Sequence, residues 1–300
     1  MILILTDNEE PTSDLIIDWL LYYKKPFVRI CSKNIIKIDK IYSTTEGYEC
    51  VFSFMQFGKM QTIDTKDITS YWYRRSHLTV GMPNIEESEE QVKKIISEYI
   101  QSEYQEAYRI LNSILDRKAK INKIADNAII KIHVLEEAKR IGLKVPDTLI
   151  CNDKKTLIPF YNKHNGEIIT KPIGDPLALF LLGFRSYTTR INIDNIPNQF
   201  GLSLFQEEVK KEIELRIFYL RSKFYTSAIF SQLDRQTEVD FKNYNSEKPN
   251  RVIPFILPIE IQKLLRKLMN KLSLKSGSID MVLSIHGEYI FLEVNVCAGS

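Results

Sequence analysis

Residues 277–295, GSIDMVLSIHGEYIFLEVN, decide the fold of this chain. The segment is apolar on both sides of His286-Gly287, which is a pair typical of a two-residue hairpin turn, so it predicts two antiparallel strands. With this turn, Ile285 pairs with Glu288. Counting outward along both strands then sets Asp280 directly opposite Glu293.

Alternation along the two strands separates a polar face from an apolar one. Asp280, Glu293 and Asn295 share the polar face because side chains two residues apart point the same way. The opposite face is a predicted core face, made of Met281, Leu283, Ile285, Ile290, Leu292 and Val294.

The facing carboxylates present an electrostatic conflict, because like charges directly opposite each other destabilise a strand pair. A divalent cation would resolve the conflict, since two carboxylates and an amide oxygen are hard ligands suited to Mg²⁺. The alternative is a solvated polar face that tolerates an unfavourable pair. Spacing alone does not choose between these two interpretations.

Two lysines could supply positive charge near this hairpin. Lys131 falls on a predicted helix, and Lys171 ends a predicted strand before Pro172. A lysine in such a place can reach nucleotide phosphates as a point charge. Taken singly, a lysine in either place is more often an ordinary surface residue.

The segment Phe205–Val209, with the sequence FQEEV, changes from apolar to acidic, as a hinge between two lobes would. Backbone groups from Gln206 through Glu207 and Glu208 to Val209 could contact the edge of an adenine. The carboxylate of Glu207 or of Glu214 would then bind a ribose hydroxyl.

Glu214 and Arg216 lie two residues apart and share one face of their predicted strand. An ion pair between them is one interpretation. The other directs Arg216 at a carboxylate or an acyl phosphate, which the planar guanidinium group fits well.

The remaining pattern predicts an α/β organisation. Strands at 1–6 and 27–31 flank a helical segment and indicate a parallel sheet, and a long helix over 86–118 closes a first domain near residue 115. A second helix is expected from Asp126, as N-cap, to Ile141, with Gly142 as its stop. Further predicted elements are strands at 147–151, 167–171 and 202–209, a hairpin over 214–230 turning at Arg221-Ser222, and a helix over 258–272.

Composition narrows the class of protein. The net charge is +3, from 41 basic and 38 acidic residues, so the overall charge does not indicate a protein that binds nucleic acid. The four cysteines lack the spacing of a zinc site and are expected to be buried thiols in a reducing cytosol. No apolar stretch approaches the roughly 18 residues of a membrane helix, and the first residues lack the basic region of a signal peptide. A cytoplasmic protein without a membrane partner is expected.

In this order the motifs resemble those of the ATP-grasp ligases, close to the RimK-type branch. The resemblance is nearest to the peptide maturases that make graspetides, the microviridin-like group. It rests on Trp72-Tyr73-Arg74-Arg75, on 141–146 (IGLKVP) with Thr148, on 169–172 (ITKP), on 230–232 (FSQ), on 240–244 (DFKNY), on 249–251 (PNR), on Leu257-Pro258, on 277–280 (GSID) and on 291–295 (FLEVN). It covers nearly the whole chain.

The resemblance implies a fold and a set of site residues. An N-terminal α/β domain (1–115) would precede two lobes, 116–205 and 206–300, that enclose ATP between antiparallel sheets. Lys131 and Lys171 would hold phosphates, residues 206–209 the adenine, and Glu214 another part of the nucleotide. Asp280, Glu293 and Asn295 would bind Mg²⁺. Arg216 and Lys242 would act on the reacting acyl group.

The resemblance also implies a reaction and a partner. Such enzymes phosphorylate Asp or Glu side chains of a ribosomal precursor peptide, which has a leader and an acidic core. A Ser or Thr hydroxyl or a Lys amine of the same peptide then attacks, which gives a macrocyclic ester or amide. Relatives also suggest a homodimer.

Two departures from the family pattern stand out. Lys242 replaces the usual arginine, and the sequence ends at Ser300, where the pattern continues with a Pro- and Gly-containing segment and a helix. Two alternatives therefore stay open. One is a RimK-type ligase that adds amino acids to a peptide or protein, and the other is a degenerate ATP-grasp chain that binds a peptide without catalysis.

Overall fold

The computed structural model describes most of residues 1–300. The residues outside the description are Arg75, Ser88, 175–187, Arg235, 241–242, Tyr244 and 297–300, together with the side chains of Asn127 and Ala128. The predicted site residue Lys242 is therefore outside the described residues. The chain forms two compact units, one of Met1–Ala128 and one that begins at Ile129.

The first unit opens with a β-α-β arrangement, as predicted. Strand β1 (Ile2–Thr6) lies between β2 (Phe27–Ile30) and β6 (Ser70–Arg74) and is parallel to both. Helix α1 (Pro11–Tyr22) joins β1 to β2. The parallel sheet confirms the α/β class expected for this part of the chain.

A second sheet in this unit was not predicted. Strands β3 (Ile35–Thr44), β4 (Gly47–Gln56) and β5 (Lys59–Asp64) form an antiparallel meander, and short β7 (Thr79–Val80) joins β3 in parallel. Phe52 and Phe54 of β4 are buried and stack at 6.3 Å between ring centroids. A 3₁₀ turn, η1 (Thr65–Asp67), follows β5.

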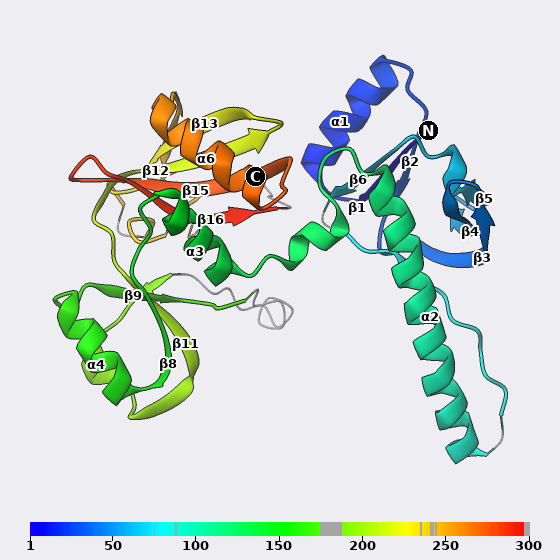
Figure 1. The fold of residues 1–300 in the computed structure, drawn as a ribbon, viewed down its shortest axis with the longest axis horizontal. Helices are drawn as coiled ribbons and strands as arrows, with labels where there is room; N and C mark the ends of the chain where they lie inside the picture. The colour runs from blue at the N-terminus through cyan, green and yellow to red at the C-terminus, as the bar shows by residue number, and fades with distance from the viewer. Residues whose placement is uncertain are drawn as a thin grey trace. The chain divides into compact units, whose positions relative to one another are not determined.

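Helix α2 (Glu90–Lys118) is the predicted long helix, beginning four residues later than expected. Figure 1 shows it running away from the sheets of its own unit. Its buried residues are Leu111, Ile114 and Leu115, all near its C-terminal end. The last turns therefore anchor the helix to the core of the first unit, which also contains Phe52 and Tyr71.

The helix expected from Asp126 begins later. Residues Ile124–Ala128 form a separate 3₁₀ turn, η2, and the Asp126 side chain accepts a hydrogen bond from the Lys123 amide at 2.8 Å. Helix α3 (Lys131–Ile141) follows, so the assignment of Asp126 as its N-cap was wrong. Gly142 has φ = 102°, a left-handed conformation that glycine adopts easily, and it ends α3 as predicted.

A five-stranded antiparallel sheet forms the largest layer of the second unit. Its order is β14 (Arg251–Phe255), β13 (Lys223–Phe230), β12 (Lys211–Leu220), β15 (Ser276–Ser284) and β16 (Tyr289–Asn295). Helices α3 and α6 (Ile259–Lys271) share one buried core with it (Figure 1). The β12–β13 turn at Arg221-Ser222 is the predicted two-residue hairpin turn, and both residues have positive φ.

A four-stranded sheet forms the other layer. Its order is β10 (Thr189–Arg190), β9 (Ile168–Lys171), β11 (Gln199–Glu207) and β8 (Thr148–Asp153). Helix α4 (Lys154–Lys163), which was not predicted, packs Leu157 against it, and a 3₁₀ turn, η3 (Ile193–Asn195), leads into β11. The predicted boundary at 205/206 falls inside β11, and the division into three parts with boundaries at 115 and 205 stays a prediction.

The register of β15 and β16 confirms that Asp280 faces Glu293, but the turn and the pairing next to it differ from the prediction. The Ser284 amide donates to the Glu288 carbonyl at 2.9 Å, so three residues, 285–287, connect the two strands and the predicted two-residue turn was wrong. Leu283 pairs with Tyr289, and a bulge at Leu292 then shifts the register so that Asp280 pairs with Glu293. Phe291 therefore replaces Leu292 in the core, and Ile285 is exposed.

The described part of the chain has no helix of the length and apolar character that crossing a membrane requires.

An ion pair links α1 to the parallel sheet of the first unit. Arg74 at the end of β6 donates to Glu10 at 3.0 Å, and both side chains are about nine-tenths buried. Burial raises the pKa of the Glu10 carboxyl, but hydrogen bonds from Arg74 and Ser13 outweigh it and lower the pKa from 4.5 to about 2.

Glu10→Gln should lower the free energy of unfolding of the first unit by about 3 kcal/mol at pH 7. A depressed carboxyl pKa stabilises the fold above pH 4.5 and loses this effect as the pH falls toward 2. The difference from wild type should therefore shrink over that range. Both tryptophans, Trp19 and Trp72, lie in this unit, so their fluorescence in urea titrations measures it. A difference that does not change with pH would contradict the assignment, and Glu46→Gln in an exposed turn is the control.

Candidate functional site

A cavity of about 220 Å³ lies in the second unit, between the two sheets. Six of the residues singled out in the sequence line it: Lys131, Lys171, Gln206, Glu214, Asp280 and Glu293. They come from α3, β9, β11, β12, β15 and β16. The fold therefore brings together residues that are up to 162 positions apart in the sequence, from Lys131 to Glu293.

The two facing carboxylates, Asp280 and Glu293, line this cavity. Asp280 and Glu293 are direct strand partners, and their side chains are only 7% and 16% exposed. Asn295 lies on the same face and donates to Glu293 Oε1 at 3.2 Å. Two carboxylates and an amide on one face are a donor set of the kind that Mg²⁺ prefers, so the chemistry of the predicted residues fits such an ion.

Lys131 places a positive charge beside this pair. Its Nζ lies 3.9 Å from Glu293 Oε2. Lys131 is the first residue of α3, where the helix dipole disfavours a cation. A cation retained there, next to a cavity, suits a role in holding anions better than a role in stabilising the helix.

Arg216 has a partner different from the one considered in the sequence. It pairs across the sheet with Asp280 and donates to Asp280 Oδ1. The alternative of a Glu214–Arg216 ion pair was therefore wrong. Arg216 holds one of the two facing carboxylates from the neighbouring strand, and its contact with a substrate stays a prediction.

Glu214 is held by a lysine that sequence reasoning missed. Lys211 Nζ lies 3.0 Å from Glu214 Oε1, and the Ser231 hydroxyl donates to the same oxygen at 2.5 Å. Burial raises the pKa of Glu214, while the Lys211 charge and the Ser231 hydrogen bond act in the opposite direction. A bulge between Lys211 and Ile213 turns Lys211 onto the face of Glu214, and no simple alternation rule would find this pair.

A smaller cavity of about 50 Å³ adjoins the first and shares Gln206 and Lys211 with it. Glu207, Glu208 and Val209 line it, as expected for the predicted hinge. The amides of Glu207 and Glu208 already donate to the carbonyl groups of Asp147 and Glu167. An adenine edge would therefore use the carbonyl groups of this segment or the amide of Val209.

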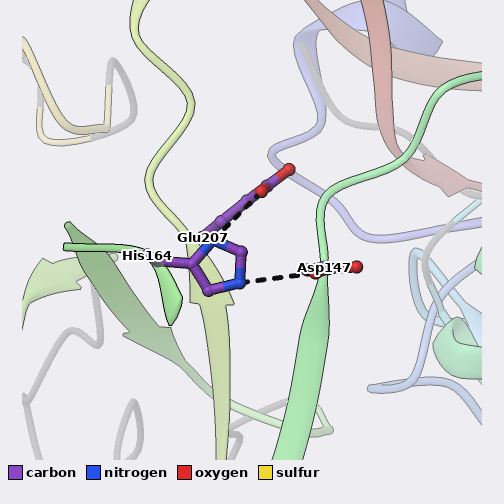
Figure 2. A group of neighbouring side chains, drawn as sticks. All are labelled: Asp147, His164 and Glu207. Atoms are coloured by element: carbon purple, nitrogen blue, oxygen red, sulfur yellow. Dashed lines mark ion pairs between the residues drawn. The ribbon is translucent and has the colours of Figure 1, made fainter. Parts of the chain in front are cut away.

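The side chains of the hinge segment have their own partners. Gln206 is buried and donates to the Thr148 hydroxyl at 2.8 Å. Glu208 accepts from Arg190, which also pairs with Glu238. The Glu207 carboxylate lies 3.4 Å from the His164 ring (Figure 2).

Asp240 is a second residue that sequence reasoning did not single out as part of the site. It lines the larger cavity and accepts a hydrogen bond from the Thr188 amide at 3.1 Å. Its only signal in the sequence was its place at the start of the 240–244 motif.

The sequence matches no family model and no curated protein. Among solved structures, the chain is similar to the macrocyclase MdnC bound with precursor peptide MdnA from Microcystis aeruginosa MRC, with a TM-score of 0.74 and 23% identity over 100% of this chain and 93% of that one.

Two further structures have the same fold. A RiPP-associated ATP-grasp ligase from Chryseobacterium gregarium, in complex with ADP and a leader and core peptide, gives a TM-score of 0.75 and 21% identity over 99% of this chain and 89% of that one. The ATP-grasp ligase PsnB, complexed with minimal precursor, Mg and ADP, gives 0.64 and 13% over 99% and 89%. The chain has the ATP-grasp fold.

Within the ATP-grasp fold, the two sheets of the second unit are the layers between which the predicted nucleotide residues lie. The expectation of ATP-grasp lobes made of antiparallel sheets is confirmed. The individual roles of Lys131, Lys171, Glu214, Arg216 and the other site residues stay predictions.

The two facing carboxylates should respond differently to neutralisation. Asp280→Asn removes the negative charge that accepts the Arg216 hydrogen bond and should lower the free energy of unfolding by about 1–3 kcal/mol. Glu293→Gln removes one of two opposed charges and should change it by less than about 1 kcal/mol. Calorimetric unfolding of both variants measures the difference. Equal destabilisation by the two would contradict the Arg216–Asp280 pairing.

Proposed function

We propose that this chain is an ATP-dependent ligase that activates Asp or Glu side chains of a ribosomally made precursor peptide and joins them to Ser or Thr hydroxyls or Lys amines of the same peptide. One observation carries the proposal. Facing carboxylates and two lysines line a single cavity that continues into the hinge cavity. Similar structures that hold precursor peptides, ADP and Mg support it.

The nucleotide would lie across both cavities. Its adenine would occupy the smaller one, beside residues 206–209, and Glu214 would accept a hydrogen bond from a ribose hydroxyl. Lys131 and Lys171 would contact the phosphates as point charges. Asp280, Glu293 and Asn295 would hold Mg²⁺, which would neutralise phosphate charge during transfer.

The need for ATP follows from the chemistry of the peptide carboxylate. Hydroxide is a poor leaving group, so a carboxylate does not acylate a hydroxyl or an amine at neutral pH. Transfer of the γ-phosphoryl group gives an acyl phosphate with a good leaving group, and the attacking side chain then releases phosphate. Enclosure between the two sheets would protect this intermediate from water.

Two basic residues are proposed to act on the acyl group. Arg216 would orient it while also holding Asp280, and Lys242 would supply a second charge. Holding both reacting side chains on one peptide makes the attack effectively intramolecular. Such proximity can lower a barrier by roughly 7–11 kcal/mol.

The proposal also covers the peptide partner, the cellular compartment and the oligomeric state. The peptide partner would have a leader and an acidic core, whose charge suits the lysines of the site. Buried free thiols at Cys31, Cys50 and Cys151 suit a reducing cytoplasm. A homodimer is proposed from the family resemblance alone.

Lys171→Ala should weaken ADP binding at least tenfold in the presence of Mg²⁺, because it removes a charge that would contact the phosphates. Titration calorimetry with ADP measures the effect. Lys155→Ala, on the exposed surface of α4, is the matched control and should bind as wild type does. Unchanged ADP affinity in folded Lys171→Ala would reject the phosphate role.

The reaction itself has a distinct mass signature. Incubation of the enzyme with a candidate precursor, ATP and Mg²⁺ should lower the peptide mass by one water per linkage and release one ADP and one phosphate. Formation of AMP and pyrophosphate would contradict the acyl phosphate route. A mass gain of one amino acid would favour a RimK-type ligase, and binding of peptide without ATP turnover would favour a non-catalytic ATP-grasp chain.

A further inference from the structure

Three side chains of metal-ligating types meet on the four-stranded sheet, outside the larger cavity, and one of them, Glu207, also lines the smaller cavity. Asp147 directly precedes β8, His164 directly follows α4, and Glu207 is the last residue of β11. One ligand atom from each can be chosen so that all three lie within 4.8 Å of one another. Figure 2 shows the imidazole between the two carboxylates.

The two ring nitrogens of His164 have different surroundings. Nε2 is buried, makes no hydrogen bond with any described residue and lies 3.4 Å from Asp147 Oδ2. Nδ1 faces Glu207 Oε2 at 3.4 Å. The side chain is only 12% exposed, and Phe160 packs against the ring with centroids 4.7 Å apart. The ring is thus held with an unused, buried nitrogen toward a carboxylate.

We propose that Asp147, His164 and Glu207 form a binding site for a divalent transition ion such as Zn²⁺ or Co²⁺. The ion would bind His164 Nε2 and the Asp147 carboxylate, and Glu207 would complete the site. Ligand bonds of about 2.0–2.2 Å in tetrahedral geometry place neighbouring ligand atoms about 3.4 Å apart. The Nε2–Asp147 distance already has this value.

Glu207 suits either of two roles around the same ion. One ligand atom from each of the three side chains lies within 4.8 Å of the others, so rotation of the Glu207 side chain would bring its carboxylate toward the ion. Without that movement, the Glu207 carboxylate, 3.4 Å from Nδ1, would accept the Nδ1 proton in a hydrogen bond and so leave the lone pair on Nε2. Imidazole is a ligand that transition ions favour and Mg²⁺ does not, so this site differs in chemistry from the facing carboxylates.

The ammonium group of Lys163 lies beside Asp147, where the metal ion is proposed to bind. Lys163 donates to Asp147 Oδ2, and this hydrogen bond lowers the pKa of the Asp147 carboxyl. The Lys163 side chain is 64% exposed, and such surface pairs contribute little to stability. A divalent ion would therefore replace the lysine at low cost, and Asp147 would already carry the required charge.

The test is equilibrium dialysis of the full chain with Co²⁺, in excess Mg²⁺ to occupy hard-oxygen sites, together with the visible absorption of bound Co²⁺. Wild type should bind one Co²⁺ per chain with the spectrum of a nitrogen- and oxygen-ligated ion. His164→Gln should lower the affinity at least tenfold, whereas His286→Gln, in the exposed hairpin loop, should not. Lys163→Met should raise the affinity, because it removes the competing cation.

Asp147→Asn gives a second variant that keeps the ring in place, and it should also lower the affinity at least tenfold. Equal Co²⁺ affinity in wild type, His164→Gln and Asp147→Asn would overturn the proposal, as would the absence of binding to wild type at millimolar Co²⁺. The measurement uses no nucleotide and no peptide. Its failure is therefore separate from any failure of the proposed ligase function.

Discussion

The opposition of Asp280 and Glu293 is the constraint on which the second unit depends. Two carboxylates that face each other across a strand pair, both largely buried, need positive charge close by. The protein provides part of it through Arg216 from β12 and Lys131 from α3. Lys131, Asp280 and Glu293 line one cavity, and Arg216 contacts Asp280 beside it. The residues that balance charge in the folded protein are therefore the same residues that are proposed to bind Mg²⁺ and phosphate.

The sequence was sufficient where local chemistry determined the structure. The β-α-β opening, the stop of α3 at Gly142 and the turn at Arg221-Ser222 each follow from short patterns and match the structure. The Asp280–Glu293 pairing also matches, although the predicted turn was one residue too short. The bulge at Leu292 offset that error, which shows that a register can be right while the count that produced it is wrong.

The sequence was insufficient where bulges and tertiary partners decided the outcome. The Lys211–Glu214 pair depends on a bulge, and the Arg216–Asp280 pair depends on the register between β12 and β15. Helix α4 contains Pro159, a residue that argues against a helix, yet Leu157 buries completely against the sheet. In each case the packing against a neighbouring strand or sheet, rather than the local pattern, fixes the structure.

The central claim is that the facing carboxylates bind a divalent cation together with the nucleotide, and the most direct test is the thermodynamic coupling between Mg²⁺ and ADP. ADP affinity is measured by calorimetry over a range of Mg²⁺ concentrations in wild type and in Glu293→Gln. The account predicts that Mg²⁺ strengthens ADP binding to wild type beyond its effect on free ADP, and that the variant loses at least about 1.4 kcal/mol of this coupling, a factor of ten. The same Mg²⁺ dependence in both proteins would show that Glu293 does not hold the ion.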